Sequence, residues 1–340
     1  MSHKTLKTLL FSVSLLCCQL SGLIQETAAE NSPPRINGTF IQLFATHKDW
    51  KKEDWEKLFF YFKSLHISYL IVQWSAFNDV EFFSDPDIPG TQTAPLDAIL
   101  NLADANDMKI FLGLSYESNY WDEIQKDLQV RKNYFIHTLM SSRSIAKELS
   151  LTLRKHPSFQ GWYIPQEIDD INWVSPDAQR ILFAYLRKIK LYLHKLTPDK
   201  AVAISGFSNA ARTPKEFEKF WSNLLRKTSI DLVLFQDGIG AHKLNFETLP
   251  LYLKAIHNAV HANSKQLQVI VEVFEQTSGY PVNNDHFTAQ AASWNRIQKQ
   301  MAIDSLYSSQ LIAFSVPEYM TPLGVPNAEE LFNRYLEDKK

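Results

Sequence analysis

The chain has 340 residues, of which 45% are hydrophobic, 13% aromatic and 21% charged. This composition excludes a disordered or fibrous chain, and the length suits two average domains or one large α/β barrel. Lysine and arginine total 35 against 37 acidic residues, for a net charge of −2, so the basic surplus typical of proteins that bind nucleic acids or anionic membranes is missing.

The first 29 residues have the pattern of a secretory signal peptide. Two lysines precede an apolar segment at residues 9–16, and small residues at 27–29 provide a cleavage site. We therefore expect cleavage near Ala29, a mature domain over residues 30–340, and a secreted or periplasmic location. The alternative is an uncleaved membrane anchor, although the apolar run falls short of the ~20 residues that span a bilayer.

Both cysteines, Cys17 and Cys18, lie inside this segment. Lipoprotein attachment is an alternative for them, but Leu15 and Leu16 are not the small residues that usually precede such a site. The expected mature chain has no cysteine, so it has neither a disulfide nor a thiolate nucleophile. No later segment is long and apolar enough to predict a membrane span in the mature chain.

From Ile36 onward, short apolar runs alternate with stretches of helical periodicity. Most runs are apolar at both odd and even positions, as a parallel sheet buried on both faces requires. These runs predict eight strands, at residues 36–44, 67–74, 108–114, 159–164, 201–207, 230–235, 267–274 and 310–316.

The segments between the runs show helix signals. Apolar residues recur at intervals of three and four over residues 55–65. Ser175 and Thr213 each precede a proline, which places an N-cap before the first helical position, and Glu216 completes a capping box with Thr213. Each predicted strand is therefore followed by a predicted helix.

Eight strand–helix pairs predict an α/β fold with a single (β/α)8 TIM barrel over residues 30–340, preceded by the signal peptide. The links that follow the strands are long, at 75–94, 115–132, 236–245 and 275–284, whereas the links that precede them are short. Long loops at the C-terminal face of a barrel build its active site. A doubly wound open sheet is the alternative, but no Gly-x-Gly-x-x-Gly turn follows the first strand.

Acidic residues at two strand ends are the candidate catalytic groups. Glu167 closes the fourth run, although a solvated loop residue is its alternative interpretation. Glu272 lies inside the apolar seventh run, where burying a carboxylate costs several kcal/mol unless partners offset it. The alternative for Glu272 is a buried ion pair. Glu275 has the opposite parity, so it is an alternative catalytic residue, and the sequence leaves open which of the two faces the mouth.

Carboxylates on strands four and seven of one barrel face each other across its mouth. Glycoside hydrolysis uses such a pair, with one protonated acid and one ionised carboxylate. A separation of ~5–5.5 Å lets the second carboxylate attack the sugar directly, whereas ~6.5–9.5 Å leaves room for an attacking water.

Polar and aromatic residues at other strand ends are candidates for substrate binding, because they would surround the same mouth. They are Gln42, Gln73, Trp74, Tyr116, Trp162, Tyr163, Gln236, Asp237 and Glu318. The chain has no Walker A loop and no Gly-x-Ser-x-Gly elbow, and we expect neither a cofactor nor a metal. A metal-dependent hydrolase that uses Asp169, Asp170, Asp237 and His242 is a further alternative.

Together, the motifs at residues 38–42, 161–167, 236–240 and 271–275 resemble the bacterial domain-of-unknown-function family 4434. That family is similar to the clan-A-type glycoside hydrolases, which are built on TIM barrels. The resemblance implies Glu167 as the acid/base and Glu272 as the nucleophile of a retaining enzyme. Such enzymes commonly have Asn before the acid/base, where this chain has Gln166, and the longer amide is expected to serve the same hydrogen bond to a sugar 2-hydroxyl.

We therefore expect an exported glycoside hydrolase that acts on a poly- or oligosaccharide, in which a neighbouring carboxylate raises the pKa of Glu167. The alternative is a non-catalytic carbohydrate-binding barrel in polysaccharide export or remodelling. Both interpretations expect a carbohydrate as the partner and no nucleic acid.

Overall fold

The computed structural model describes residues 33–84, 93–279 and 287–338. Pro34–Lys340 form one compact unit. The predicted signal peptide and its cleavage site lie outside the described residues. Within the described ranges, no helix combines the length and the apolar character needed to cross a bilayer.

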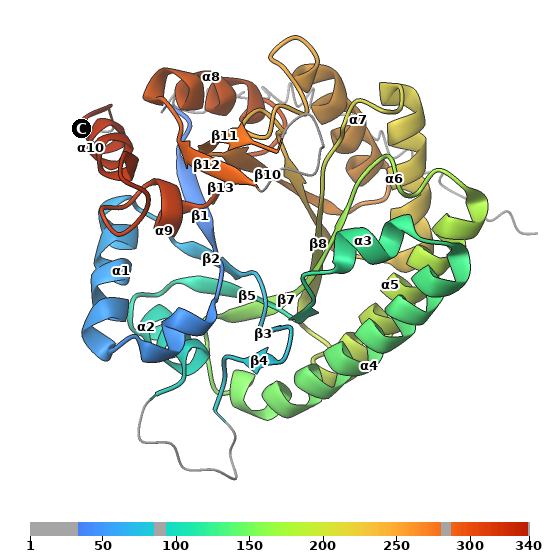
Figure 1. Ribbon diagram of the computed structural model, residues 1–340, viewed down its shortest axis with the longest axis horizontal. Coiled ribbons are helices and arrows are strands. Elements are labelled where there is room, and N and C mark those ends of the chain that lie inside the picture. Colours follow the sequence, from blue (N-terminus) through green and yellow to red (C-terminus); the bar gives the residue numbers. More distant parts are fainter. Residues whose placement is uncertain (1–32, 85–92, 280–286, 339–340) are drawn as a thin grey trace, which may run out of the picture. The chain divides into compact units, whose positions relative to one another are not determined.

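Eight parallel strands close into a barrel surrounded by helices, which confirms the predicted (β/α)8 fold (Figure 1). Around the barrel the strands follow their order in the chain, and the last pairs with the first. They are β1 (Ile36–Ile41), β2 (Tyr69–Val72), β5 (Lys109–Gly113), β7 (Phe159–Ile168), β8 (Ala201–Gly206), β9 (Leu232–Gln236), β10 (Gln266–Glu272) and β13 (Leu311–Phe314). β7 ends at Ile168 rather than at the predicted Ile164, so Glu167 lies within a strand.

Helices pack around the barrel, and the predicted caps begin two of them. Ser175 Oγ accepts the Ala178 N–H at 3.1 Å, and Thr213 and Glu216 form the expected capping box. The helices are α1 (Lys52–Ser64), α2 (Pro95–Ala105), α3 (Tyr120–Gln125), α4 (Leu128–Leu153), α5 (Pro176–Leu196), α6 (Pro214–Thr228), α7 (Leu249–Ala262), α8 (Trp294–Asp304), α9 (Val316–Tyr319) and α10 (Ala328–Asp338), with a 3₁₀ turn at Ala45–Asp49.

The long loops after the strands contain small sheets that the sequence did not predict. β3 (Ala76–Phe77) pairs with β4 (Val80–Glu81) and with β6 (Ser115–Tyr116). β11 (Phe274–Ser278) and β12 (Thr288–Ala291) form an antiparallel pair directly after β10. These sheets order loop segments at the C-terminal end of the barrel, where the candidate site lies.

Alternate side chains of the barrel strands fill two separate cores. The larger core lies between the strands and the helices, and it includes Val72, Trp162, Ile164 and Val271. The smaller core fills the inside of the barrel and consists of Phe40, Ile71, Phe111, Tyr163, Ala203, Leu232, Leu234, Ile270 and Ile312. Membership of the two cores therefore shows which face of each strand points inward.

Candidate active site

The side chains of Glu272 and Gln236 point into the barrel at the C-terminal ends of β10 and β9. Glu272 lies two residues after Ile270 of the inner core, and Gln236 lies two residues after Leu234. Gln236 Nε2 donates a hydrogen bond to Glu167 Oε1 at 2.7 Å, so Glu167 also faces the mouth. The structure thus brings the two predicted carboxylates to the same end of the barrel, on opposite sides of β8 and β9.

Glu167 is partly exposed, whereas the residues on either side of it are buried. The pairing of β7 with β8 is irregular between Ile164 and Ile168, the segment that contains Glu167, and such irregularities are common beside active sites. Burial raises the pKa of Glu167, the Lys243 ammonium and the Gln236 amide oppose the rise, and Asp169 adds to it. The expectation that a neighbouring carboxylate is the main cause is therefore corrected, because burial is the larger effect.

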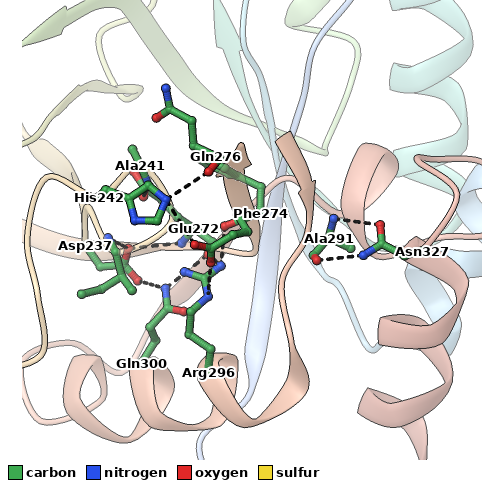
Figure 2. Close-up of polar contacts among 12 residues, drawn as sticks. Asp237, Ala241, His242, Glu272, Phe274, Gln276, Ala291, Arg296, Gln300 and Asn327 are labelled. Atoms are coloured by element: carbon green, nitrogen blue, oxygen red, sulfur yellow. Dashed lines mark hydrogen bonds and ion pairs between the residues drawn. The ribbon is translucent and has the colours of Figure 1, made fainter. Parts of the chain in front are cut away.

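Glu272 is only 1% exposed, and a backbone amide holds its carboxylate. The Ala241 N–H donates to Glu272 Oε2 at 2.7 Å (Figure 2). Burial raises the pKa of Glu272 to about 8, and the negative charge of Asp237 adds to the rise, whereas Lys243, the Ala241 N–H and Arg296 oppose it. Among the described residues, neither Glu272 nor Glu167 forms a direct ion pair.

The close approach of Ala241 to Glu272 depends on the glycine before it. A Cβ atom at Gly240 would lie 2.3 Å from the Phe274 carbonyl oxygen and 2.9 Å from Glu272 Cβ. Both distances are shorter than a van der Waals contact. Glycine at this position therefore lets the loop after β9 pack against the tip of β10.

A buried polar network supports the backbone of Glu272 from the side of α8 (Figure 2). Asp237 is fully buried; its Oδ1 accepts the Glu272 N–H at 3.4 Å and its Oδ2 accepts Gln300 Nε2 at 2.5 Å. Gln300 and Arg296 both donate to the Glu272 carbonyl oxygen, at 3.3 and 3.2 Å. The predicted role of Asp237 in substrate binding is corrected, because its side chain is enclosed behind β10 and holds the catalytic candidate.

Glu275, the alternative catalytic residue, has each carboxylate oxygen close to a basic side chain. Its Oε1 lies 3.2 Å from His242 Nε2, and its Oε2 lies 3.2 Å from Arg296 Nε. Arg296 belongs to α8 and contacts Glu272 from behind the strand. The structure thus answers the question that the sequence left open, since Glu272 rather than Glu275 faces the mouth.

Lys243 is the main residue of the site that sequence reasoning missed. It lies on the loop after β9, and its ammonium is 3.1 Å from the centroid of the Phe207 ring. Burial lowers the pKa of Lys243, and Glu272, Glu167 and two aspartates act to raise it. The only signal in the sequence is its place three residues after Gly240, which does not reveal that one cation lies close enough to lower the pKa of both carboxylates.

Two predicted glutamines also extend inward-facing rows. Gln42 follows Phe40 by two residues, and Gln73 follows Ile71 by two. Gln42 is partly exposed, and the side-chain oxygen of Gln73 has no hydrogen-bond partner among the described residues. Their positions fit the predicted role in binding hydroxyl groups.

Two predicted tryptophans are corrected, because neither ring can reach a ligand. Trp162 is fully buried in the outer core, where its Nε1 donates to Thr197 Oγ1 at 2.9 Å. Trp74 is 3% exposed, and its ring stacks with Phe77, at a centroid distance of 4.8 Å, and with Tyr116, at 5.4 Å.

Tyr163 and Gln166 are corrected as well. Tyr163 is fully buried in the inner core, and its hydroxyl shares a 2.6 Å hydrogen bond with Ser205 Oγ. Gln166 is also fully buried; its amide donates to the Ser115 carbonyl oxygen at 2.9 Å and accepts the Tyr185 hydroxyl at 2.8 Å. Because Tyr185 lies on α5 in the outer core, Gln166 points away from the mouth and cannot take the place of the Asn.

Two further candidates, Tyr116 and Glu318, keep partly exposed side chains. Tyr116 lies close enough to Glu167 for the carboxylate charge to raise the pKa of the phenol, although burial is the larger cause. Glu318 lies on α9 and accepts a hydrogen bond from Ser315 Oγ, and burial raises its pKa to about 7. Tyr116 therefore lies close enough to Glu167 to interact with its charge.

The residues of the metal alternative do not converge. Asp169 accepts two hydrogen bonds from Asn172, and Asp170 accepts hydrogen bonds from Ser208 and from backbone amides. Asp237 is enclosed behind β10. Within residues 33–84, 93–279 and 287–338, no group of three or more His, Cys, Asp or Glu side chains is placed to hold a metal ion.

The chain belongs to the family described as Domain of unknown function (DUF4434), whose model matches residues 36–330. It is 26% identical over 186 residues to the uncharacterized protein YbcH of Escherichia coli (strain K12). That match covers 55% of this chain and 59% of YbcH, so the chain aligns with less than two thirds of this relative.

Solved structures of similar fold include a Bacteroides thetaiotaomicron VPI-5482 protein described as a "putative alpha-L-fucosidase", with a TM-score of 0.73 and 20% identity over 91% of this chain and 94% of the other. A beta-galactosidase from Marinomonas ef1 has a TM-score of 0.55 and 11% identity, over 89% of this chain and 59% of the other. The intracellular xylanase TsXylA of Thermoanaerobacterium saccharolyticum JW/SL-YS485, in complex with xylotriose, has a TM-score of 0.50 and 12% identity, over 88% of this chain and 94% of the other. At these identities the likeness shows the TIM-barrel fold alone.

Proposed function

We propose that this DUF4434 chain is a glycoside hydrolase that cleaves a poly- or oligosaccharide with Glu167 and Glu272. The observation that carries the proposal is the placement of the two carboxylates at the tips of β7 and β10, where both face the mouth of the barrel beside Lys243. A barrel of this kind uses the C-terminal ends of its strands for catalysis.

In the proposed mechanism Glu167 is the acid/base. Burial raises its pKa, so the carboxyl group retains a proton that it gives to the glycosidic oxygen as the bond to the anomeric carbon breaks. Its partial exposure lets water enter for the second step, in which Glu167 takes a proton from that water.

Glu272 is the nucleophile of the same mechanism. The Ala241 N–H and the buried network around Asp237 fix its carboxylate, and the nearby Lys243 favours its ionised form. Its oxygen bonds to the anomeric carbon while the leaving group departs, and water then displaces it, so the anomeric configuration is retained. Because burial raises its pKa to about 8, we expect its ionised fraction to increase as the pH rises toward that value, and the active form also requires Glu167 to keep its proton.

The test is a panel of substrates assayed with the wild type, Glu167→Gln and Glu272→Gln. The panel contains α-L-fucosides, β-galactosides and xylo-oligosaccharides, which are suggested by the structures of similar fold. The expected result is hydrolysis by the wild type with net retention, seen by NMR of the first product, and strong loss in both variants. Wild-type rates in either variant would refute the residue's role, and binding of a glycan without turnover would favour the carbohydrate-binding alternative.

We also propose that the protein is exported, on the basis of the signal-peptide pattern in residues 1–29. Cell fractionation and N-terminal sequencing test this proposal. The expected result is a mature protein that begins at Glu30 outside the cytoplasm, and a cytoplasmic protein that retains residues 1–29 would contradict it.

A further inference from the structure

A cavity of about 750 Å³ opens at the N-terminal end of the barrel, the end opposite Glu167 and Glu272. Residues at the beginnings of six strands line it, namely Asn37, Tyr69, Lys109, Gln160, Ala201 and Gln266. Its volume falls within the range of about 300–1,000 Å³ that is usual for small-molecule sites.

Two amide oxygens in the lining lack a partner. Gln268 is 7% exposed and belongs to the inward-facing row of β10, two residues before Ile270 of the inner core. Its Oε1 and the Oδ1 of Asn37 are buried, and among the described residues neither has a hydrogen-bond partner. A buried carbonyl oxygen without a hydrogen-bond partner is unfavourable, so both atoms favour a bound donor.

The floor of the cavity is aromatic. Phe111 belongs to the inner core and Tyr69 packs against it, with ring centroids 5.5 Å apart at an interplanar angle of 33°. Charged side chains occur at the exposed rim, where Asp107 and Asp199 outnumber the single Lys109. The rim therefore disfavours an anion, and the interior combines apolar ring surface with amide acceptors.

We propose that this end of the barrel is a second binding site, which takes a neutral saccharide unit. A sugar ring supplies hydroxyl donors for the oxygens of Gln268 and Asn37, while its C–H groups pack against Tyr69 and Phe111. This site shares no side chain with the catalytic candidates, so it stands independently of the proposed hydrolase function.

The experiment measures ligand binding to the full chain by methyl NMR. Leu267, which lines the cavity, reports on this site, and Ile239, on the loop that holds Glu272, reports on the mouth. The probes are D-galactose, D-galacturonate, which differs from galactose by its carboxylate, and xylotriose, which tests whether a chain rather than a free sugar occupies the cavity.

The informative variants are Gln268→Leu, which keeps the side-chain volume, and Asn37→Ala, which removes the second acceptor from another strand. Gln236→Leu at the mouth is the control. We expect galactose or xylotriose to shift the Leu267 signal, with a dissociation constant that rises about five- to tenfold in either cavity variant and is unchanged in the control.

Three results would overturn the proposal. One is the absence of any saccharide-induced shift at Leu267, which would indicate a cavity filled only by water. Another is a dissociation constant at this signal that is unaffected in both Gln268→Leu and Asn37→Ala while thermal melting shows folded variants. The third is galacturonate binding as tightly as galactose, which contradicts a neutral ligand.

Discussion

At the tip of β7, Glu167 is partly exposed and receives a side-chain hydrogen bond from Gln236. At the tip of β10, Glu272 is buried, accepts a backbone hydrogen bond from Ala241, and has a main chain supported by Asp237, Gln300 and Arg296. The two residues have the same chemistry, yet the Glu167 carboxylate is partly exposed and held by a side chain, whereas the Glu272 carboxylate is buried and held by a backbone amide.

This difference matches the different demands of the two proposed roles. A proton donor that later acts as a base exchanges its proton with substrate and water, so access to solvent helps it. A nucleophile has to meet the anomeric carbon at a defined position, and small displacements are costly. The comparison teaches that the surroundings of each carboxylate, rather than its identity, assign its role.

The largest expected effect comes from removing either carboxylate in turn. Glu167→Ala and Glu272→Ala should each lower turnover by about 10²–10⁴-fold or more. Added azide separates the roles. In Glu167→Ala it should restore turnover and give a glycosyl azide of retained configuration, because Glu272 still forms the covalent intermediate.

In Glu272→Ala, azide should instead occupy the space of the missing carboxylate and give the inverted glycosyl azide. The measurement is NMR of the azide product from an aryl glycoside that the wild type cleaves. The opposite pairing of products would exchange the two roles, and identical products from both variants would contradict a retaining pair.

A smaller effect is expected from Gly240→Ala, which tests how firmly Glu272 is held. The new Cβ would clash with the Phe274 carbonyl oxygen and Glu272 Cβ. The free energy of unfolding should therefore fall by about 1–3 kcal/mol, and turnover should fall by about 10²-fold. Denaturant unfolding and initial rates measure the two effects.

The matched control for this variant is Gly161→Ala, which lies on the strand β7. The new Cβ would also lie 2.3 Å from a carbonyl oxygen, in this case that of Ala201. We expect a comparable loss of stability in the control with near-normal turnover in the folded protein. Equal losses of turnover in both variants would mean that Gly240 acts only through stability.

The fold could be predicted from the sequence because its signals are local. Apolar runs, the caps at Ser175 and Thr213, and the asymmetry of loop lengths each depend on neighbouring residues, and all eight strands are where these signals placed them. Glu272 could be predicted because a carboxylate inside an apolar strand is conspicuous.

The remaining parts of the site depend on which way a side chain points, and the sequence does not predict these directions. Gln166 and Trp162 were expected at the mouth because they lie near Glu167 in the chain, but both point to the outer core. Lys243 and Arg296 approach the carboxylates from a loop and from α8, and no pattern in the sequence reports a contact between separate elements.

Lys243→Met is expected to act mainly on the pH dependence. Glu272 has to be ionised to attack, and its ionised fraction rises with pH through its pKa, which is about 8 in the wild type. The Lys243 ammonium lowers this pKa, so its removal should move the acid limb of kcat/KM to higher pH. Below the limb, each unit of movement lowers the rate about tenfold.

The control for this change is Lys299→Met. Lys299 also lies over an aromatic ring, 4.0 Å from the centroid of Phe246, but it is exposed. We expect its pH profile to match that of the wild type. An unchanged acid limb in Lys243→Met would mean that Lys243 does not control the ionisation of Glu272.

The smallest expected effect is that of Gln236→Leu, which acts on Glu167 alone. The Gln236 amide donates to the ionised form of Glu167 and opposes the rise of its pKa, so the substitution should raise that pKa further. Since Glu167 has to be protonated for the first step, the alkaline limb of kcat/KM should move to higher pH. One hydrogen bond is worth about 0.5–1.5 kcal/mol, so the rate at the optimum should change by less than about tenfold.

Gln73→Leu is the comparison for Gln236→Leu, because Gln73 also faces the mouth but makes no hydrogen bond to either carboxylate in the described part of the chain. It should raise KM without moving the alkaline limb. If Gln73→Leu moves this limb as far as Gln236→Leu does, the change reflects the loss of any polar group at the mouth. In that case the pKa of Glu167 depends on the general polarity of the site. Glu167 would then differ still more from Glu272, whose carboxylate is held by a backbone amide.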